Sequence, residues 1–161
     1  MDATLASNGG HDSLVLSIDS RFDWQGEPGV EASLAITSQN WDGDHEHPVR
    51  VLVAGLCLGI SAVRALHDVL AVWVSLPLHE LATTKLAGTH ALALAPGQRL
   101  DFVFGDRPDT IADRKPTVTI AFETTRLKGE HHFVTDPSCL REFADTLVAA
   151  LLEIDTNAGR T

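Results

Sequence analysis

The chain has few basic residues and a clear excess of acidic ones. Twelve Lys and Arg stand against 22 Asp and Glu in 161 residues, a formal net charge of −10 at pH 7. Because the phosphates of nucleic acids and of anionic membranes repel such a charge, we expect neither as a partner. A basic protein is the partner class that this charge favours, since opposite charges speed association.

Cysteine is also scarce. Cys57 and Cys139 are the two cysteines of the chain, and so distant a pair supplies neither a metal-binding spacing nor a disulfide framework. After Met1 the sequence has no basic segment followed by an apolar one, which is the order found in a signal peptide. The apolar stretch over residues 49–60 contains Arg50 and is too short to span a bilayer. These features predict a cytoplasmic protein without membrane association.

Apolar and polar residues alternate in several segments, and a period of two is typical of a strand with one buried face. Helical spacing replaces this alternation in three places: after Ile60, over a short segment beyond Pro77, and after Asp136, which is placed to cap the last helix. The expected strands cover residues 13–18, 30–38, 49–58, 90–95, 100–104, 117–123 and 131–135, and the expected helices cover 60–73, 78–86 and 137–154.

Short turns between the expected strands favour antiparallel pairing, because parallel neighbours need long crossovers. We therefore predict an α+β fold: an antiparallel sheet of about six strands, with the central helix and the C-terminal amphipathic helix packed on one face. Residues 1–161 form a single domain in this interpretation, with flexible termini over about 1–11 and 156–161. The sequence shows no internal repeat.

The acidic residues are concentrated near the N-terminus. Residues 1–60 hold nine Asp and Glu against Arg21 and Arg50, and the densest cluster follows Trp41. An acidic loop with a large aromatic suits a basic protein partner, because the charges steer encounter and the ring supplies buried area. The predicted binding residues are Trp41, Asp42, Asp44 and Glu46.

The same cluster does not have the pattern of a metal site. With Asp42 as the first position, a calcium loop needs Gly at the place of His47 and Glu at the place of Val53. Zinc would require two further ligands at defined spacing. No glycine-rich phosphate loop occurs elsewhere, so we predict no metal and no cofactor.

Residues 55–59 read Gly-Leu-Cys-Leu-Gly between an expected strand and an expected helix. This segment resembles the nucleophile turn of class I glutamine amidotransferases, which implies that Cys57 would be the nucleophile of a cysteine-dependent hydrolase or amidotransferase. The base of that family is a histidine two residues before a glutamate, whereas His131 and His132 precede Phe133 and Val134. A thiol without a base is a poor nucleophile, so a structural Cys57 is the favoured interpretation.

The order of elements resembles that of bacterial immunity proteins encoded beside polymorphic toxins of the wall-associated type, and of related uncharacterised families. The resemblance rests on the early strands with a Trp-containing segment, on the spacing of Leu66, Leu70 and Leu78, and on the strand that ends in a turn at Pro96. It implies a non-catalytic cytoplasmic protein that neutralises a toxin domain by covering it. A cysteine-dependent enzyme and a dimeric structural or accessory protein are the alternatives.

Overall fold

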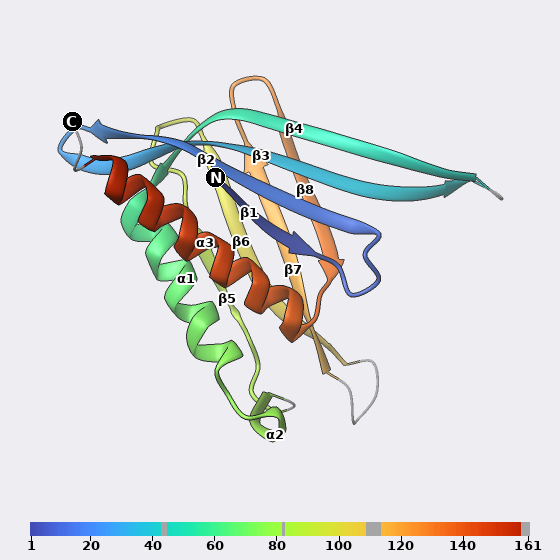
Figure 1. The fold of residues 1–161 in the computed structure, drawn as a ribbon. Coiled ribbons are helices and arrows are strands. Elements are labelled where there is room, and N and C mark those ends of the chain that lie inside the picture. The colour runs from blue at the N-terminus through green and yellow to red at the C-terminus, as the bar shows by residue number, and fades with distance from the viewer. Residues whose placement is uncertain (43–44, 82, 109–113, 159–161) are drawn as a thin grey trace.

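The chain folds into two antiparallel sheets and three helices (Figure 1). The computed structural model describes residues 1–42, 45–81, 83–108 and 114–158. The elements in chain order are β1 (Asp2–Ala6), β2 (Asp12–Trp24), β3 (Glu27–Asp42), β4 (His45–Gly59), α1 (Ile60–Val74), α2 (Leu78–Leu81), β5 (Gly88–Ala91), β6 (Arg99–Pro108), β7 (Arg114–Glu123), β8 (Lys128–Val134) and α3 (Pro137–Ala158).

The two halves of the chain share one plan. Strands β1 to β4 form the first sheet in sequence order, and β5 to β8 form the second sheet in the same way. A long helix follows each sheet, α1 after β4 and α3 after β8. The fold thus repeats a unit of four strands and a helix, although the sequence shows no repeat.

The α+β class, the antiparallel pairing and the C-terminal helix agree with the sequence-based prediction, whereas the single sheet of about six strands does not. Alternation of apolar residues determines which face of a strand is buried, but it does not say which strands share a sheet. Helices α1 and α2 separate β4 from β5 along the chain. An isolated bridge between Leu58 and Ala93 links the end of the first sheet to the second half.

The N-terminal segment, which we expected to be a flexible terminus, contains β1. This strand pairs with β2, and the side chains of Ala3 and Leu5 are fully buried. The Met1 ammonium donates a hydrogen bond to the Ile18 carbonyl oxygen, 2.8 Å away. With two buried apolar side chains in five residues, β1 is part of the core rather than a free end.

One core joins the inner faces of both sheets to the helices. Figure 1 shows α1 and α3 side by side, and α3 also packs against β1. The rings of Phe102 on β6 and Phe143 on α3 stack with centroids 5.7 Å apart. The buried residues of α3 are Leu140, Phe143, Ala144, Leu147, Ala150, Leu151 and Ile154.

The predicted cap of α3 is present. Asp136 Oδ1 accepts hydrogen bonds from the backbone N–H groups of Ser138 (2.8 Å) and Cys139 (3.0 Å). Burial acts to raise the pKa of the Asp136 carboxyl. The hydrogen bonds from these N–H groups and from the Ser138 hydroxyl outweigh burial and hold that pKa below its usual value. The helix begins here because the carboxylate satisfies N–H groups that lack a partner within the helix.

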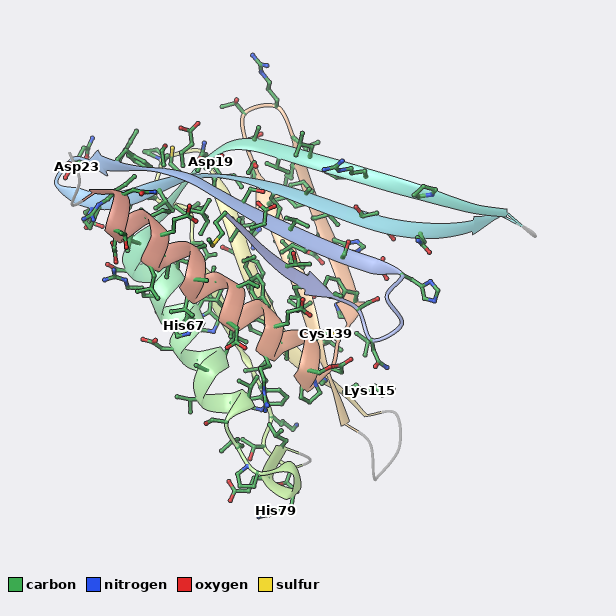
Figure 2. The ribbon with its side chains drawn as sticks, in the orientation of Figure 1. Asp19, Asp23, His67, His79, Lys115 and Cys139 are labelled. Carbon is green, nitrogen blue, oxygen red and sulfur yellow. The ribbon has the colours of Figure 1, made fainter. Side chains whose placement is uncertain are left out.

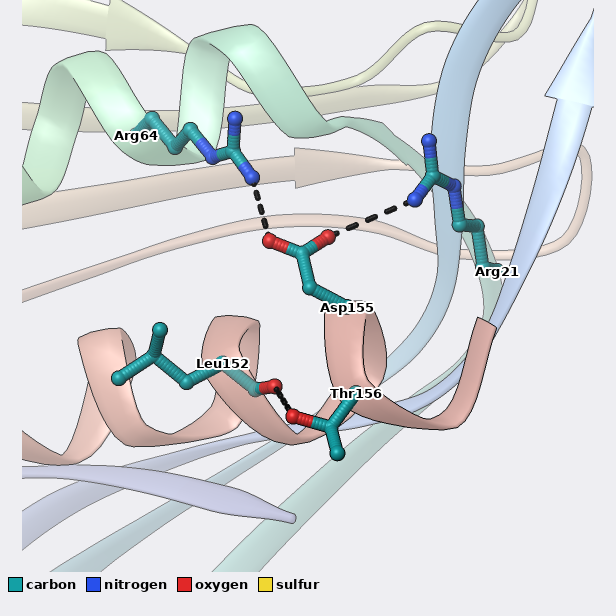
Figure 3. A network of polar contacts seen from close by, with 5 residues as sticks. All are labelled: Arg21, Arg64, Leu152, Asp155 and Thr156. Carbon is teal, nitrogen blue, oxygen red and sulfur yellow. Dashed lines mark hydrogen bonds and ion pairs between the residues drawn. The ribbon is translucent and has the colours of Figure 1, made fainter. Parts of the chain in front are cut away.

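An ion-pair network holds the other end of α3 (Figure 3). Asp155 lies between two arginines, with Arg64 of α1 at 2.6 Å and Arg21 of β2 at 3.4 Å. A carboxylate near a helix C-terminus is unfavourable by itself, because the negative end of the helix dipole lies there. The two guanidinium groups offset this and connect α3 to both α1 and β2.

Candidate functional site

Strands β3 and β4 extend well beyond the rest of the first sheet (Figure 1). The pairing of β2 with β3 ends at Asp12 and Ser38, whereas β3 and β4 remain paired out to Asp42 and His45. Residues 39–42 and 45–48 therefore form a projecting two-stranded segment, which we call the arm. At its base, the His11 ring Nδ1 and Gln39 Oε1 are 3.3 Å apart.

The acidic segment predicted to bind a partner is the tip of this arm. Trp41 on β3 lies directly opposite Glu46 on β4, and Asp42 lies opposite His45. Asp44 lies outside the described residues. Hairpin pairing thus brings the backbones of Trp41, Asp42 and Glu46 to one end of the molecule.

A cleft of about 400 Å³ lies between the second sheet and the part of β3 and β4 next to the arm. One wall comes from β3 and β4, through Ile36, Val49 and Val51, and the other comes from the β7–β8 hairpin, through Phe122 and Leu127. Val49 is 45% exposed and Leu127 is 38% exposed, so each wall presents an apolar side chain to solvent. The cleft is continuous in sequence with the arm, because Val49 follows Pro48.

Charged groups surround this cleft. His131 lines it, and its Nε2 atom lies 3.4 Å from the Asp12 carboxylate. That buried Nε2 has no hydrogen-bond partner among the described residues. Lys128 also lines the cleft but forms an ion pair with Glu123 at 3.5 Å, while Glu130 adds a further carboxylate. Exposed Arg50 and Arg126 add positive charges beside Val49 and Leu127, so the cleft has charges of both signs at its rim.

The sequence predicted an acidic loop between residues 38 and 49, whereas β3 and β4 stay paired out to Asp42 and His45, because hairpin pairing continues past the apolar alternation. The cleft was not predicted. Val49 and Val51 alternate in phase with the buried Val53, so they have the pattern of an ordinary buried strand. Nothing in the sequence shows that β4 is the last strand of its sheet or that the β7–β8 turn lies across from Val49. The one signal available is Leu127, an apolar residue between two basic ones in a short turn.

The Gly-Leu-Cys-Leu-Gly segment connects the two halves of the chain. Gly55 has a φ of +71°, in the left-handed region that favours glycine, at a register shift between β3 and β4. The Gln98 side chain donates to the Gly55 carbonyl oxygen and accepts from the Cys57 N–H, both at 2.8 Å. Leu94 N–H donates to the Cys57 carbonyl oxygen at 2.7 Å. The backbone of Cys57 therefore holds the segment between β5 and β6 against β4.

The Cys57 thiol is not placed at a sharp turn before the helix. Cys57 lies within β4, opposite Glu31 of β3, and α1 begins three residues later at Ile60. Desolvation, followed by the nearby Glu31 carboxylate, raises the pKa of Cys57 above its ordinary value of 9.0. Near neutral pH the thiol is therefore largely protonated and weakly nucleophilic.

The remaining titratable candidates are separated in space. His131 and His132 point to opposite faces of β8: His131 lies near Asp12, while His132 Nδ1 is 2.7 Å from the Thr119 hydroxyl oxygen. Cys139 lies in the first turn of α3 (Figure 2), far from β4 in the sequence. Within the part of the chain that the structure describes, no three His, Cys, Asp or Glu residues form a group that could hold a metal ion.

Comparisons with known proteins add no function. No family model and no curated protein matches the chain. Among solved structures, the plant transcriptional regulator PBF-2 is similar at a TM-score of 0.45 and 10% identity, covering 99% of this chain and 86% of that one. A likeness of that size carries no argument about what this chain binds. In the described residues, no helix has the length and apolar character needed to cross a bilayer.

Proposed function

We propose that this chain is a cytoplasmic, non-catalytic binding protein that neutralises a basic protein partner, as an immunity protein neutralises a toxin domain. The arm is the part that contacts the partner, through Trp41, Asp42, Asp44 and Glu46. The resemblance in element order to polymorphic-toxin immunity proteins supports the same proposal.

The observation that carries the proposal is the position of the acidic segment at the end of the arm (Figure 1). In this segment β3 and β4 pair with each other beyond the point where the pairing of β2 with β3 ends. A net charge of −10 adds a long-range attraction for a basic surface. The same charge disfavours the pairing of two copies through their arms.

The state of Cys57 supports a non-catalytic role. Its raised pKa keeps the thiol protonated, and its backbone groups are engaged with Gln98 and Leu94. A cysteine nucleophile needs the opposite environment, one that favours the thiolate.

The proposal is tested by capturing partners from a lysate of the source organism with the parent protein and with a triple variant, Asp42→Asn, Asp44→Asn and Glu46→Gln. A basic protein retained by the parent and reduced with the triple variant is then measured by surface plasmon resonance at two salt concentrations. We expect the triple variant to associate more slowly, with a flatter salt dependence, because exposed charges act mainly on association. Trp41→Ala should speed dissociation and cost about 2 kcal/mol or more of binding free energy.

A matched control removes the same charge from α3, with Glu142→Gln, Asp145→Asn and Glu153→Gln, all at exposed positions. This control should associate faster than the arm variant, since its charges lie away from the arm. Equal kinetics for the two triple variants, together with parent-like dissociation of Trp41→Ala, would refute binding through the arm. Retention of no basic protein by the parent would count against the function itself.

A further inference from the structure

The outer face of the first sheet, on the side away from the core, carries small and uncharged side chains over most of its area. Helices α1 and α3 pack on the inner face (Figure 1). Outward-pointing residues pair in rows that run from β1 towards β4, because alternate side chains of a strand point to opposite faces. The central row is Thr4, Val15, Ala35 and Leu52, and the flanking rows are Ala6, Ser13, Thr37 and Arg50 on one side and Asp2, Ser17 and Ser33 on the other. We call these residues the outer patch.

The outer patch has the composition of an interface centre. Leu52 is 60% exposed, so the face is open to solvent at β4. Val15 and Ala35, at the middle of the patch, are half-buried and carry no polar side-chain atom. The centres of protein interfaces are depleted in charged residues, as this patch is.

Two charges of opposite sign lie at diagonal corners of the outer patch. Asp2 is on the edge strand β1 and Arg50 is on the edge strand β4, in opposite flanking rows. Both are exposed, and neither side chain has an ion pair or a hydrogen bond within the described residues. Three strand spacings separate β1 from β4 by about 14 Å, and four residues along a strand separate the flanking rows by about 13 Å. The patch is therefore nearly square.

This shape determines how the patch can meet a second copy of itself. Two sheets pack face to face with their strands either about 30° or about 90° apart. In an aligned pair, the rows and strands of the two copies coincide, so Asp2 meets an uncharged end of β1 or β4. When the two-fold axis runs along the diagonal from Ala6 to Ala54, the strands cross at about 90° and Asp2 of each copy lies against Arg50 of the other. Two-fold symmetry makes this ion pair twice.

We propose that the chain forms a homodimer through the outer patch, with the strands of the two sheets crossed and reciprocal ion pairs between Asp2 and Arg50. The uncharged centre brings Val15 and Ala35 of the two copies together. The patch itself has no net charge, and at about 0.15 M salt the repulsion between more distant carboxylates is screened beyond about 8 Å.

The other charges near the outer patch do not oppose this arrangement. Glu31 and Asp19 are exposed beyond the Asp2 row, and crossing the strands places them outside the β4 edge of the other copy. The Met1 ammonium is bonded to the Ile18 carbonyl oxygen in the plane of the sheet, whereas the Asp2 side chain points out from the face. Beyond the Arg50 row, Gln39 is uncharged.

The patch is smaller than the about 800 Å² that each partner buries in a standard complex, so the expected dimer is weak. Sedimentation equilibrium of the intact chain, from about 10 µM to about 1 mM at constant salt, measures the dimer dissociation constant. Arg50→Glu places two carboxylates together at each corner and should raise this constant at least about tenfold. Ala35→Arg should abolish dimerisation, because it puts two unpaired charges at the centre. Melting curves confirm that the variants are folded.

Two further variants separate the corner contact from general charge effects. Arg126→Glu makes the same change in net charge at an exposed position in the β7–β8 turn, and it should dimerise like the parent. The exchange Asp2→Arg with Arg50→Asp restores both ion pairs with reversed sign and should return the dissociation constant to within about threefold of the parent. A monomeric parent at about 1 mM would overturn the proposal. Equal constants for Arg50→Glu and Arg126→Glu, or no recovery in the exchanged variant, would overturn it as well.

Discussion

At the scale of single residues, two glycines are required because phenylalanine rings lie across them. Gly29 is opposite Phe22 in the β2–β3 pair, and Gly129 is opposite Phe122 in the β7–β8 pair. A Cβ added at Gly29 would lie 2.6 Å from Phe22 Cζ, and one added at Gly129 would lie 2.5 Å from Phe122 Cζ. The rings thus occupy the space that a side chain would take.

These two positions should respond differently to alanine. Phe122 is 5% exposed and packs in the core, so Gly129→Ala should destabilise the fold by about 1–3 kcal/mol through overpacking. Phe22 is half-buried at the end of the first sheet and can move, so Gly29→Ala should cost less. Urea denaturation of both variants measures the difference. A larger loss for Gly29→Ala would mean that Phe22, not Phe122, is the fixed ring.

Cys57 should react slowly in the folded protein. Its raised pKa leaves little thiolate near pH 7, and thiolate is the reactive form. The rate of alkylation by iodoacetamide, followed by mass spectrometry in a Cys139→Ser background, measures this. Urea-unfolded protein is the control and should react faster at the same pH. Rapid stoichiometric alkylation of the native chain would revive the interpretation of Cys57 as a nucleophile.

At the scale of elements, the arm combines a projecting hairpin with a protected edge. β4 is the last strand of its sheet, and an unpaired edge can pair with other chains. Pro48 has no N–H to donate, and Arg50 is an exposed charge within the same edge. These two residues disfavour edge-to-edge association.

The helix α3 closes the core, and its removal should abolish folding. It packs against β1, β2 and α1 of the first half and stacks Phe143 on Phe102 of the second half. Phe143→Ala should therefore cost about 3–5 kcal/mol of unfolding free energy, measured by urea denaturation. A chain ending at Asp136 should show no cooperative melting. A folded 1–136 fragment would show that α3 is an appendage instead.

At the scale of the whole molecule, the two halves are joined by contacts that are distant in sequence. Gln98 and Leu94 of the second half bond to the backbone of Gly55 and Cys57 in the first half. At the opposite end, the Thr135 hydroxyl donates to the Ala6 carbonyl oxygen at 2.8 Å. Helix α3 of the second half also packs against β1 of the first half. Through these contacts the two repeated units share one core.

The sequence alone determined the local features of this protein. The period of two along β2, β3, β6 and β7, the helical spacing from Ile60 and the capping by Asp136 depend on residues close in the chain. For that reason they could be predicted without knowledge of the fold. The acidic character of residues 1–60 is likewise a property of composition.

Only the tertiary structure decided how these elements are arranged. The separation into two sheets depends on which strands pair, and the arm beyond Ser38 depends on where β2 begins. The cleft between Val49 and Leu127 depends on how the β7–β8 hairpin lies beside β4. Alternation repeats along a strand and carries no information about its partner or its end. The role of Gly55 also emerged only here, because Gln98, which bonds to the backbone of Gly55 and Cys57, lies 43 residues beyond Gly55 along the chain.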